Sequence, residues 1–250
     1  MTCAIDVNNL FFNYENFSMQ DIKMELHQAE HKAMVGLNGS GKTTLFKLML
    51  GLLKPSAGEI FVFEEKVEQE NLWKIRREIG FLFQNPDDQL FAPTVWEDVA
   101  FGPRNLGLPE EEVSKRVKDS LDFVGMLNYA ERPVNQMSHG QAKRVALAGI
   151  LTMEPCILFL DEPFTGLDFP MVKGIVEIIQ KLRSQGISVL FTTHNRFFLE
   201  HWADSVVVLK EGRVIFDGPT EEALSTPVVL EQIGDWDKLR NQMRDSRRSG

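Results

Sequence analysis

The sequence predicts an α/β fold built on a largely parallel sheet. Short apolar runs rich in β-branched and aromatic residues alternate with longer segments of helical periodicity. A glycine-rich loop stands between one of these runs and a helix, as in α/β proteins that bind phosphate groups. The chain has 250 residues, 43% of them hydrophobic, which is enough for one large domain or two small ones.

Charge and composition exclude several classes of protein. The formal net charge of -9 argues against a nucleic-acid binder, because affinity for a phosphate backbone comes from Lys and Arg. The apolar runs are far shorter than the roughly 18 residues of a membrane span, and we see no signal peptide. Cys3 and Cys156 provide no disulfide framework, and Cys156, which begins an apolar run, is expected to be a buried thiol. We expect a cytosolic protein; if it works at a membrane, another chain must hold it there.

Local sequence patterns predict the individual strands and helices. A turn and a strand are expected in the segment KPSAGEIFVF, and a hairpin in SVVVLKEGRVIFDG, with Glu211 and Gly212 at its tip. A helix is expected after the glycine-rich loop, at about 42–53. The other expected strands cover residues 4–12, 31–35, 79–83, 156–160 and 188–192, the last two each followed by a helix.

The pattern becomes helical from about residue 93 to 153, which predicts a helical insertion into the α/β core. Pro109 and Glu110 begin one of its helices, since proline and acidic residues favour the first turn. Gly125 is a plausible C-cap. A single apolar stripe on this helix comprises Val113, Val117, Leu121 and Val124. We assign residues 1–220 to one domain that contains this insertion, and residues 221–250 to a short C-terminal tail.

Residues 36–43, the phosphate loop, fit the pattern G-x-x-x-x-G-K-[ST] at every position. Glycines allow successive backbone N–H groups to turn inward around phosphates, and the following helix adds its positive end. Lys42 would reach the β- and γ-phosphates, and the Thr43 hydroxyl would bind Mg²⁺. A chance glycine-rich turn is the alternative, but the strand before the loop and the helix after it argue against one. The expected ATP-binding residues here are Gly36, Asn38, Gly39, Ser40, Gly41, Lys42, Thr43 and Thr44.

The segment CILFLDEP predicts a second part of the site. Residues 157–160 form a strand expected to be buried on both faces, and Asp161 emerges at its carboxyl end, where ligands bind in open α/β sheets. Asp161 is expected to hold Mg²⁺, and Glu162 to orient or deprotonate an attacking water. An Asp-Glu pair after a strand is usually only a solvated strand end, but Lys42 in the same chain favours the catalytic interpretation.

Three further segments narrow the prediction. Ser138, in MSHGQAKRVALAG, lies just upstream of the Asp161 strand and is also a plausible N-cap. TGLD, at 165–168, follows Glu162 closely. His194 ends the strand of FTTHN; a single histidine at a strand end is more often structural, but this one shares a sheet edge with Asp161 and Glu162.

Together these motifs resemble those of the ATP-binding-cassette (ABC) ATPases over roughly residues 4–220. The phosphate loop and Asp161-Glu162 resemble the two nucleotide motifs, SHGQ the signature, THN the switch histidine, and GLD, with Asp168, the loop that crosses the dimer. Tyr14 stands where the family places an aromatic ring on adenine, although strand-end packing is an equal alternative. The resemblance implies a P-loop (RecA-like) core with an N-terminal antiparallel β subdomain and an inserted α-helical subdomain.

The resemblance also implies a mechanism. Two cassettes pack head to tail, and each ATP lies on residues 36–44 of one chain and meets Ser138 and Gly140 of the other. Glu162, His194 and Gln84 are the implied catalytic residues, and Thr43, Gln84 and Asp161 the implied Mg²⁺ ligands. His139 replaces the first of two signature glycines, which matters if the backbone needs a positive φ there.

The loop FLFQNPDDQLF, at 81–91, lies in the family at a groove that accepts a short helix of a membrane partner. Its carboxylates would form a negative rim, and its aromatic residues an apolar floor. The alternative is that the aromatic residues belong to the core of the helical insertion. The proposed floor comprises Leu90, Phe91, Trp96 and Phe101, and the rim Asp87, Asp88 and Glu97.

Residues 84–109 and SHGQAKRVALAG further resemble the ATPases of energy-coupling-factor importers, including the cobalt and nickel systems. That branch implies a transmembrane coupling subunit near Gln84–Phe91 and Trp96, a substrate-capturing membrane subunit, and a homodimer or a heterodimer with a paralogous ATPase at the cytoplasmic face of the membrane. A vitamin such as biotin is an alternative cargo. A soluble ABC protein of DNA repair or translation fits the negative charge poorly, and a sensor without turnover fits the intact catalytic residues poorly.

Overall fold

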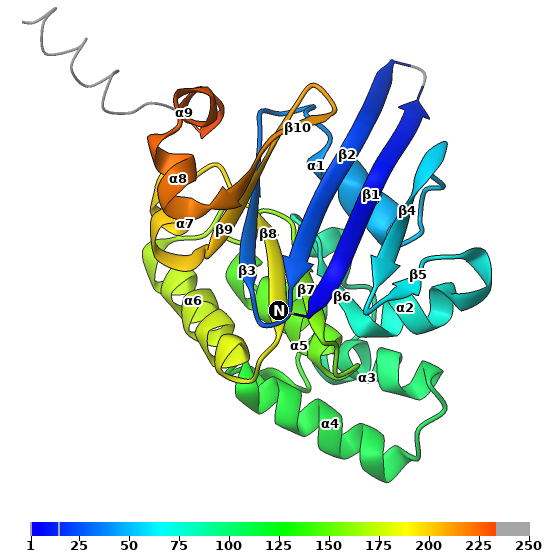
Figure 1. The fold of residues 1–250 in the computed structure, drawn as a ribbon. Helices are drawn as coiled ribbons and strands as arrows, with labels where there is room; N and C mark the ends of the chain where they lie inside the picture. Colours follow the sequence, from blue (N-terminus) through cyan, green and yellow to red (C-terminus); the bar gives the residue numbers. More distant parts are fainter. Residues whose placement is uncertain (1, 15, 234–250) are drawn as a thin grey trace, which may run out of the picture.

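The computed structural model describes residues 2–14 and 16–233, which contain two β-sheets (Figure 1). The smaller sheet is antiparallel, with strand order β2-β1-β4-β5. Its strands are β1 (Cys3–Tyr14), β2 (Phe17–His27), β4 (Ala57–Val62) and β5 (Glu65–Lys66). This sheet confirms the expected N-terminal antiparallel part of the fold.

The larger sheet has the order β10-β9-β3-β8-β7-β6, and it is parallel except for its edge strand β10. Parallel strands place their carboxyl ends at one edge, so the loops after β3, β6, β7 and β8 meet there. The strands are β3 (His31–Val35), β6 (Ile79–Leu82), β7 (Ile157–Leu160), β8 (Ser188–Thr192), β9 (Ser205–Lys210) and β10 (Arg213–Pro219).

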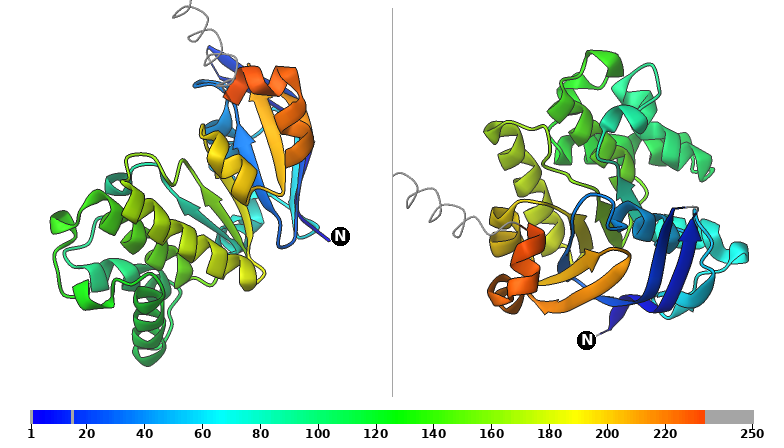
Figure 2. Two further views of the ribbon diagram at one scale, coloured as in Figure 1. Left: turned by 90° about the vertical axis from the view of Figure 1, so that its left-hand side faces the viewer. Right: turned by 90° about the horizontal axis from the view of Figure 1, so that it is seen from above.

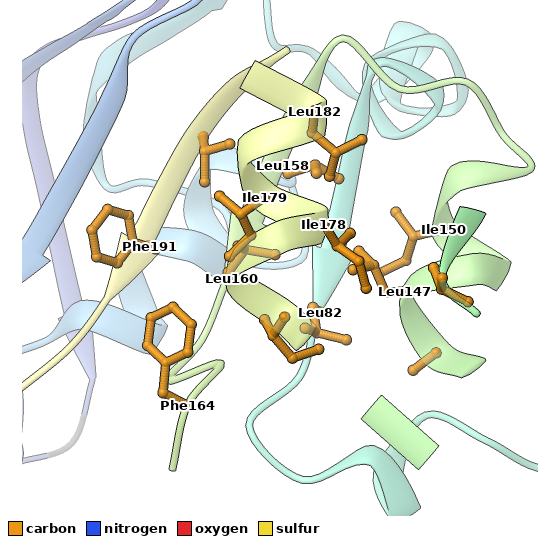
Figure 3. Packing of buried hydrophobic residues seen from close by; sticks show 14 of the residues in the cluster. Leu82, Leu147, Ile150, Leu158, Leu160, Phe164, Ile178, Ile179, Leu182 and Phe191 are labelled. Atoms are coloured by element: carbon orange, nitrogen blue, oxygen red, sulfur yellow. The ribbon is translucent and has the colours of Figure 1, made fainter. Parts of the chain in front are cut away.

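Helices cover both faces of the larger sheet. Helix α1 (Lys42–Met49) places Leu45 and Phe46 in a core shared with both sheets, while α5 and α6 pack on the opposite face, where their apolar side chains meet those of β7 (Figure 3). The remaining helices are α2 (Leu72–Glu78), α3 (Val95–Asn105), α4 (Glu110–Phe123), α5 (His139–Leu151), α6 (Phe169–Ser184), α7 (Arg196–Trp202), α8 (Thr220–Ser225) and α9 (Pro227–Ile233).

Helices α3, α4 and α5 gather at one end of the molecule, away from β1 and β2 (Figure 2). They pack on one another, as the helical pattern between residues 93 and 153 predicts. Every residue of the predicted α4 stripe is buried, and Gly125 follows the helix at φ 70°. No helix in the described ranges is both long and apolar enough to cross a bilayer.

Several local expectations need correction. Helix α1 ends at Met49, four residues before the expected end, and Cys156 is exposed rather than buried because its strand begins one residue later. Phe83 lies beyond β6 and is exposed rather than part of a buried strand. The hairpin is confirmed, with Glu211 and Gly212 both at positive φ. The last part of the expected C-terminal tail, residues 234–250, lies outside the described residues.

Candidate nucleotide site

A pocket of about 720 Å³ lies at the carboxyl edge of the larger sheet. The smaller sheet closes one side of it with side chains from the end of β1 and the start of β2, and the loops after β3, β6 and β7 form the rest. Many of the residues expected to bind nucleotide therefore meet in one place. Its lining comprises Phe12, Tyr14, Asn16, Phe17, Asn38, Gly39, Gly41, Lys42, Thr43, Thr44, Lys47, Leu53, Gln84, Asp161 and Glu162.

The phosphate loop depends on glycine at two positions. Gly36 has φ 152°, and a Cβ there would lie 2.2 Å from the Leu209 carbonyl oxygen, so a side chain would collide with backbone. Gly41, at φ 111°, is the N-cap of α1 and packs against Phe17. The loop thus delivers the backbone N–H groups at the start of α1 to the pocket, which suits an anionic ligand.

Lys42 is the buried lysine of this pocket, at only 8% exposed. Its Nζ donates to the carbonyl oxygens of Gly36 at 2.8 Å and Leu37 at 3.2 Å. Burial lowers the pKa of Lys42, although the nearby carboxylates of Glu162 and Asp161 partly oppose that shift. The ammonium is therefore poorly solvated, and a phosphate oxygen would stabilise it more strongly than the two carbonyls do.

Oxygen atoms from three elements meet beside Lys42. Thr43 Oγ1, at the start of α1, donates to Asp161 Oδ2 at 3.0 Å, and Thr192 Oγ1, at the end of β8, donates to Asp161 Oδ1 at 2.7 Å. Gln84, just after β6, lines the same pocket. Hydroxyl, carboxylate and amide oxygens are the donors that Mg²⁺ prefers, so the residues present fit this ion.

Glu162 is held at both carboxylate oxygens. His194 Nε2 lies 2.9 Å from Oε1, and Thr165 Oγ1 donates to Oε2 at 2.8 Å. The backbone of Glu162 is in the left-handed region, at φ 44°, and its N–H donates to Thr192 Oγ1 at 2.7 Å. Because a residue other than glycine rarely adopts this conformation, the surrounding structure must hold it. The arrangement presents a fixed carboxylate to the pocket, beside Lys42 and Asp161.

Ser138, Gly140 and Asp168 are placed differently, because none of them lines this pocket. Ser138 is exposed and caps α5 through a capping box with Gln141, and Asp168 caps α6 by accepting from the Met171 N–H at 3.0 Å. The structure therefore confirms the N-cap interpretation of Ser138. The structure does not bring these residues together with Lys42 in one chain.

His139 raises no backbone difficulty. It is the first residue of α5 and has helical geometry, so the backbone does not need a positive φ at this position. Gly140 is the residue with the tight environment, since a Cβ there would lie 2.3 Å from Met171 Sδ.

The position of Tyr14 is compatible with both expectations, stacking on adenine and packing at the strand end. Its ring is 69% exposed and lines the pocket, and it also stacks on Phe12 with 6.4 Å between ring centroids. Phe12 and Phe17 line the pocket beside it, although the sequence did not single them out.

A second pocket, of about 260 Å³, lies between α2, α3 and α5. Leu90, Phe91 and Phe101 line it as expected, and the two phenylalanine rings make an edge contact at 4.7 Å. Trp96 packs against the main core instead, which was the alternative for one of these aromatic residues.

The charges at the second pocket differ from the expected ones. Asp87, Asp88 and Glu97 do not line it, and Gln84 belongs to the nucleotide pocket. Its charged lining consists of Arg76, Arg77 and Asp98, and Asp98 accepts backbone N–H groups of Phe91 and Ala92 at 2.8 Å each. The acidic residues expected at the rim of a docking groove therefore lie outside the lining of this pocket and are exposed.

Sequence reasoning missed three polar residues that hold the site. Thr192 bonds both Asp161 and the Glu162 backbone, and Thr165 bonds the Glu162 carboxylate. Lys143, on α5, is fully buried and contacts the same loop. A lysine among the alanine and valine residues of α5 was the available signal, because charged residues are almost never fully buried without a partner.

Comparisons with known proteins agree with this geometry. The ABC transporter family model matches residues 19–165. An energy-coupling factor transporter ATP-binding protein EcfA from Methanothermobacter thermautotrophicus is 46% identical over 86% of this chain and 70% of its own length. The same-named protein of Methanosphaera stadtmanae is 40% identical over 93% of this chain and 85% of its own length.

A solved structure extends the likeness to the whole described fold. The cbiO1 protein of Clostridium perfringens, described as part of the ABC transporter complex cbiONQ, has a TM-score of 0.84 and 36% identity, covering 98% of this chain and 100% of its own. The family match spans more than half of the chain, and the two EcfA relatives are 46% and 40% identical over 86% and 93% of it. This chain therefore belongs to the ABC transporter ATPases, in the branch of the energy-coupling factor ATP-binding proteins.

Proposed function

We propose that this chain hydrolyses ATP as a head-to-tail dimer and thereby powers an energy-coupling-factor importer of cobalt or nickel ions. The observation that carries the proposal is the Glu162 carboxylate, which His194 and Thr165 fix in the pocket that also contains Lys42. A carboxylate in this position can orient and deprotonate a water beside the γ-phosphate of ATP.

The residues expected from the sequence to bind ATP or Mg²⁺ each have a role in this proposal. Lys42 and the N–H groups of the phosphate loop bind the β- and γ-phosphates, and Tyr14 stacks on adenine. His194 orients Glu162, and Gln84 positions the water. Thr43, Asp161 and Gln84 would hold Mg²⁺, which neutralises phosphate charge when bound. The other proposed binding residues of the loop are Gly36, Asn38, Gly39, Ser40, Gly41 and Thr44.

The dimer supplies the donors that the pocket lacks. Ser138 and Gly140 of one chain would bind the γ-phosphate held by Lys42 of the other, adding preorganised stabilisation of transition-state charge. Asp168 would lie at the crossing between the two chains. Since this chain contains both halves of such a site, a second copy suffices; a paralogous ATPase is the alternative partner.

The experiment for the hydrolytic role is Glu162→Gln, which keeps the size of the side chain and removes its basicity. We expect kcat for ATP hydrolysis to fall by about 10²–10⁴-fold, the usual contribution of a general base. ATP binding should persist, because Lys42 and the phosphate loop are unchanged. Hydrolysis at the wild-type rate would remove Glu162 from the role of base.

The membrane partner is proposed to dock beside the second pocket, at the cytoplasmic face of the membrane. Phe91 and Phe101 provide exposed aromatic surface there, and Asp87 and Asp88 are exposed on the adjoining loop. Arg76 and Arg77 give the same surface a basic side, so the partner helix would carry charges of both signs. A transmembrane coupling subunit would dock there and hold a substrate-capturing membrane subunit.

Charge reversal at Asp87 and Asp88 tests this docking surface. We expect the double lysine variant to keep basal ATPase activity and to lose metal uptake when co-expressed with its membrane subunits, since like charges across an interface repel. The matched control reverses Glu221 and Glu222, an exposed acidic pair at the start of α8. Loss of basal ATPase activity in the Asp87 and Asp88 variant would make this loop part of the catalytic machinery instead.

The metal cargo is supported by the resemblance of residues 84–109 to the cobalt and nickel systems and by the similarity to cbiO1 of the cbiONQ complex. Uptake of radioactive cobalt, nickel and biotin by the co-expressed subunits distinguishes the candidates. Uptake of biotin alone would favour the vitamin importer.

A further inference from the structure

Lys143 occupies an unusual position on α5. Its side chain is 0% exposed, and it is among the largest fully buried side chains of the described residues. Its Nζ donates three hydrogen bonds, to the carbonyl oxygens of Glu162 at 3.2 Å, Pro163 at 3.2 Å and Thr165 at 3.1 Å. An ammonium group has three N–H donors, so the loop that follows β7 uses all of them.

Burial of this charge is costly. It lowers the pKa of Lys143 to about 8, although the charge of Glu162 partly opposes the shift. An unbranched apolar side chain would fill a similar volume without that cost, but it would leave three converging carbonyl groups without a donor in the protein interior. The hydrogen bonds to the loop therefore explain why a lysine is present here.

The three carbonyl groups belong to the segment that sets the direction of the Glu162 side chain. Glu162 has φ 44°, and the Thr165 N–H donates to the Glu162 carbonyl oxygen at 3.2 Å, which closes a tight turn. Lys143 binds the same carbonyl group from the other side. Thr165, whose carbonyl group Lys143 also binds, donates its hydroxyl to the Glu162 carboxylate.

We propose that Lys143 is a positioning residue that acts through Glu162: its ammonium group holds the 162–165 loop so that the Glu162 carboxylate stays directed into the nucleotide pocket. Lys143 lies five residues after Ser138, the N-cap of α5. The same helix therefore connects the signature segment, which is proposed to contact the partner's nucleotide, with Glu162 of its own chain. This inference rests on the proposed role of Glu162.

The test compares Lys143→Met with Lys143→Gln and with Glu162→Gln in the same ATPase assay. We expect kcat of the methionine variant to fall by about 10²-fold, the effect of misplacing a reacting group by about 1 Å. KM for ATP should change by less than about threefold, because Lys143 does not line the nucleotide pocket. Glutamine retains N–H donors, so its kcat should lie between those of the wild type and the methionine variant.

A matched control separates positioning from stability. Lys32 is also buried, and its Nζ bonds Asp217 Oδ1 at 2.6 Å, away from the nucleotide pocket. Lys32→Met should lower the melting temperature while kcat per folded molecule stays unchanged. Lys143→Met should lower kcat per folded molecule, with folding verified by circular dichroism and by binding of a fluorescent ATP analogue. If the methionine variant does not fold, the glutamine variant provides the same comparison.

The double variant Lys143→Met/Glu162→Gln completes the test. If Lys143 acts through Glu162, the double variant hydrolyses ATP no more slowly than Glu162→Gln alone. An unchanged kcat in Lys143→Met, or a further tenfold loss in the double variant, would overturn the inference about Lys143. Full activity of Glu162→Gln would instead overturn the proposed role of Glu162 itself.

Discussion

Two regions of the chain carry nucleotide motifs, and they differ in what surrounds them. The phosphate loop, Asp161 and Glu162 contribute to one pocket, in which Thr43 donates to the Asp161 carboxylate. Thr192 bonds Asp161 and the Glu162 backbone, and Thr165 and His194 hold the Glu162 carboxylate. The signature segment, residues 138–141, is bonded only within its own helix start, where the Ser138 side chain is exposed. One region forms a polar pocket, and the other lies outside that pocket; in the proposed function, the second region would offer its donors to the nucleotide of another chain.

In this protein, the hydrogen bonds that a residue makes within its own chain do not decide whether that residue also binds ATP. Ser138 and Asp168 both have a sufficient structural role as N-caps, at α5 and α6. The same serine at a helix start is also well placed to bind an anion, because the first N–H groups of a helix carry partial positive charge. Variants can therefore separate what each region does for stability from what it does for ATP.

The largest effect on ATP affinity is expected from Lys42→Ala. Loss of a hydrogen bond to a charged group costs about 1.5–3 kcal/mol, so ATP affinity should fall by about 10–150-fold. Stability should not fall with it, because the variant removes a poorly solvated ammonium group. Isothermal titration with a non-hydrolysable ATP analogue measures the affinity, with the exposed Lys173→Ala as control. Wild-type affinity would contradict the placement of phosphate beside Lys42.

The role of the signature segment is tested by comparing the Ser138→Ala variant with the Thr94→Ala variant. Both serve as N-caps, of α5 and α3, so each variant should lose about 1 kcal/mol of stability. Only Ser138→Ala should also lower kcat. We expect a decrease of about tenfold, which corresponds to the lower end of the energy range for a hydrogen bond to a charged group. Thermal denaturation and ATPase assays on both proteins make the comparison. An equal kcat in the two variants would limit Ser138 to capping.

The smallest effect is expected from Tyr14→Ala. Stacking of a base on an aromatic ring contributes about 1–3 kcal/mol, and the high exposure of this ring favours the low end, so KM for ATP should rise about fivefold. Phe11→Ala, at an exposed ring that does not line the pocket, is the control. If KM stays constant and the melting temperature falls, Tyr14 is a packing residue of the strand end.

The pocket itself was predictable because its residues follow fixed positions relative to strand ends and helix starts. The phosphate loop, Asp161, Glu162 and His194 all follow parallel strands, so their meeting at one sheet edge follows from the topology alone. The comparisons confirm the fold class and the family that these motifs indicated.

Other features were not predictable, for physical reasons. Buried and exposed residues do not alternate regularly along strand β2. Asp21, at φ 51°, interrupts the two-residue period between the buried Met19 and Ile22. The role of Lys143 depends on three carbonyl groups about twenty residues away in sequence, which no local pattern encodes. The basic charge of the second pocket comes from Arg76 and Arg77 of α2, and it depends on how α2 packs beside α3 and α5 in the folded chain.

In the proposed function, ATP joins the pocket region of one chain to the signature segment of another. Sedimentation velocity of Glu162→Gln with and without ATP and Mg²⁺ tests it most directly, because bound ATP is not consumed. We predict a monomer without nucleotide, a dimer with it, and a monomer again when Ser138→Arg is added, while ATP binding to each chain persists. A Glu162→Gln protein that stays monomeric at saturating ATP, or a dimer that survives Ser138→Arg, would contradict the account.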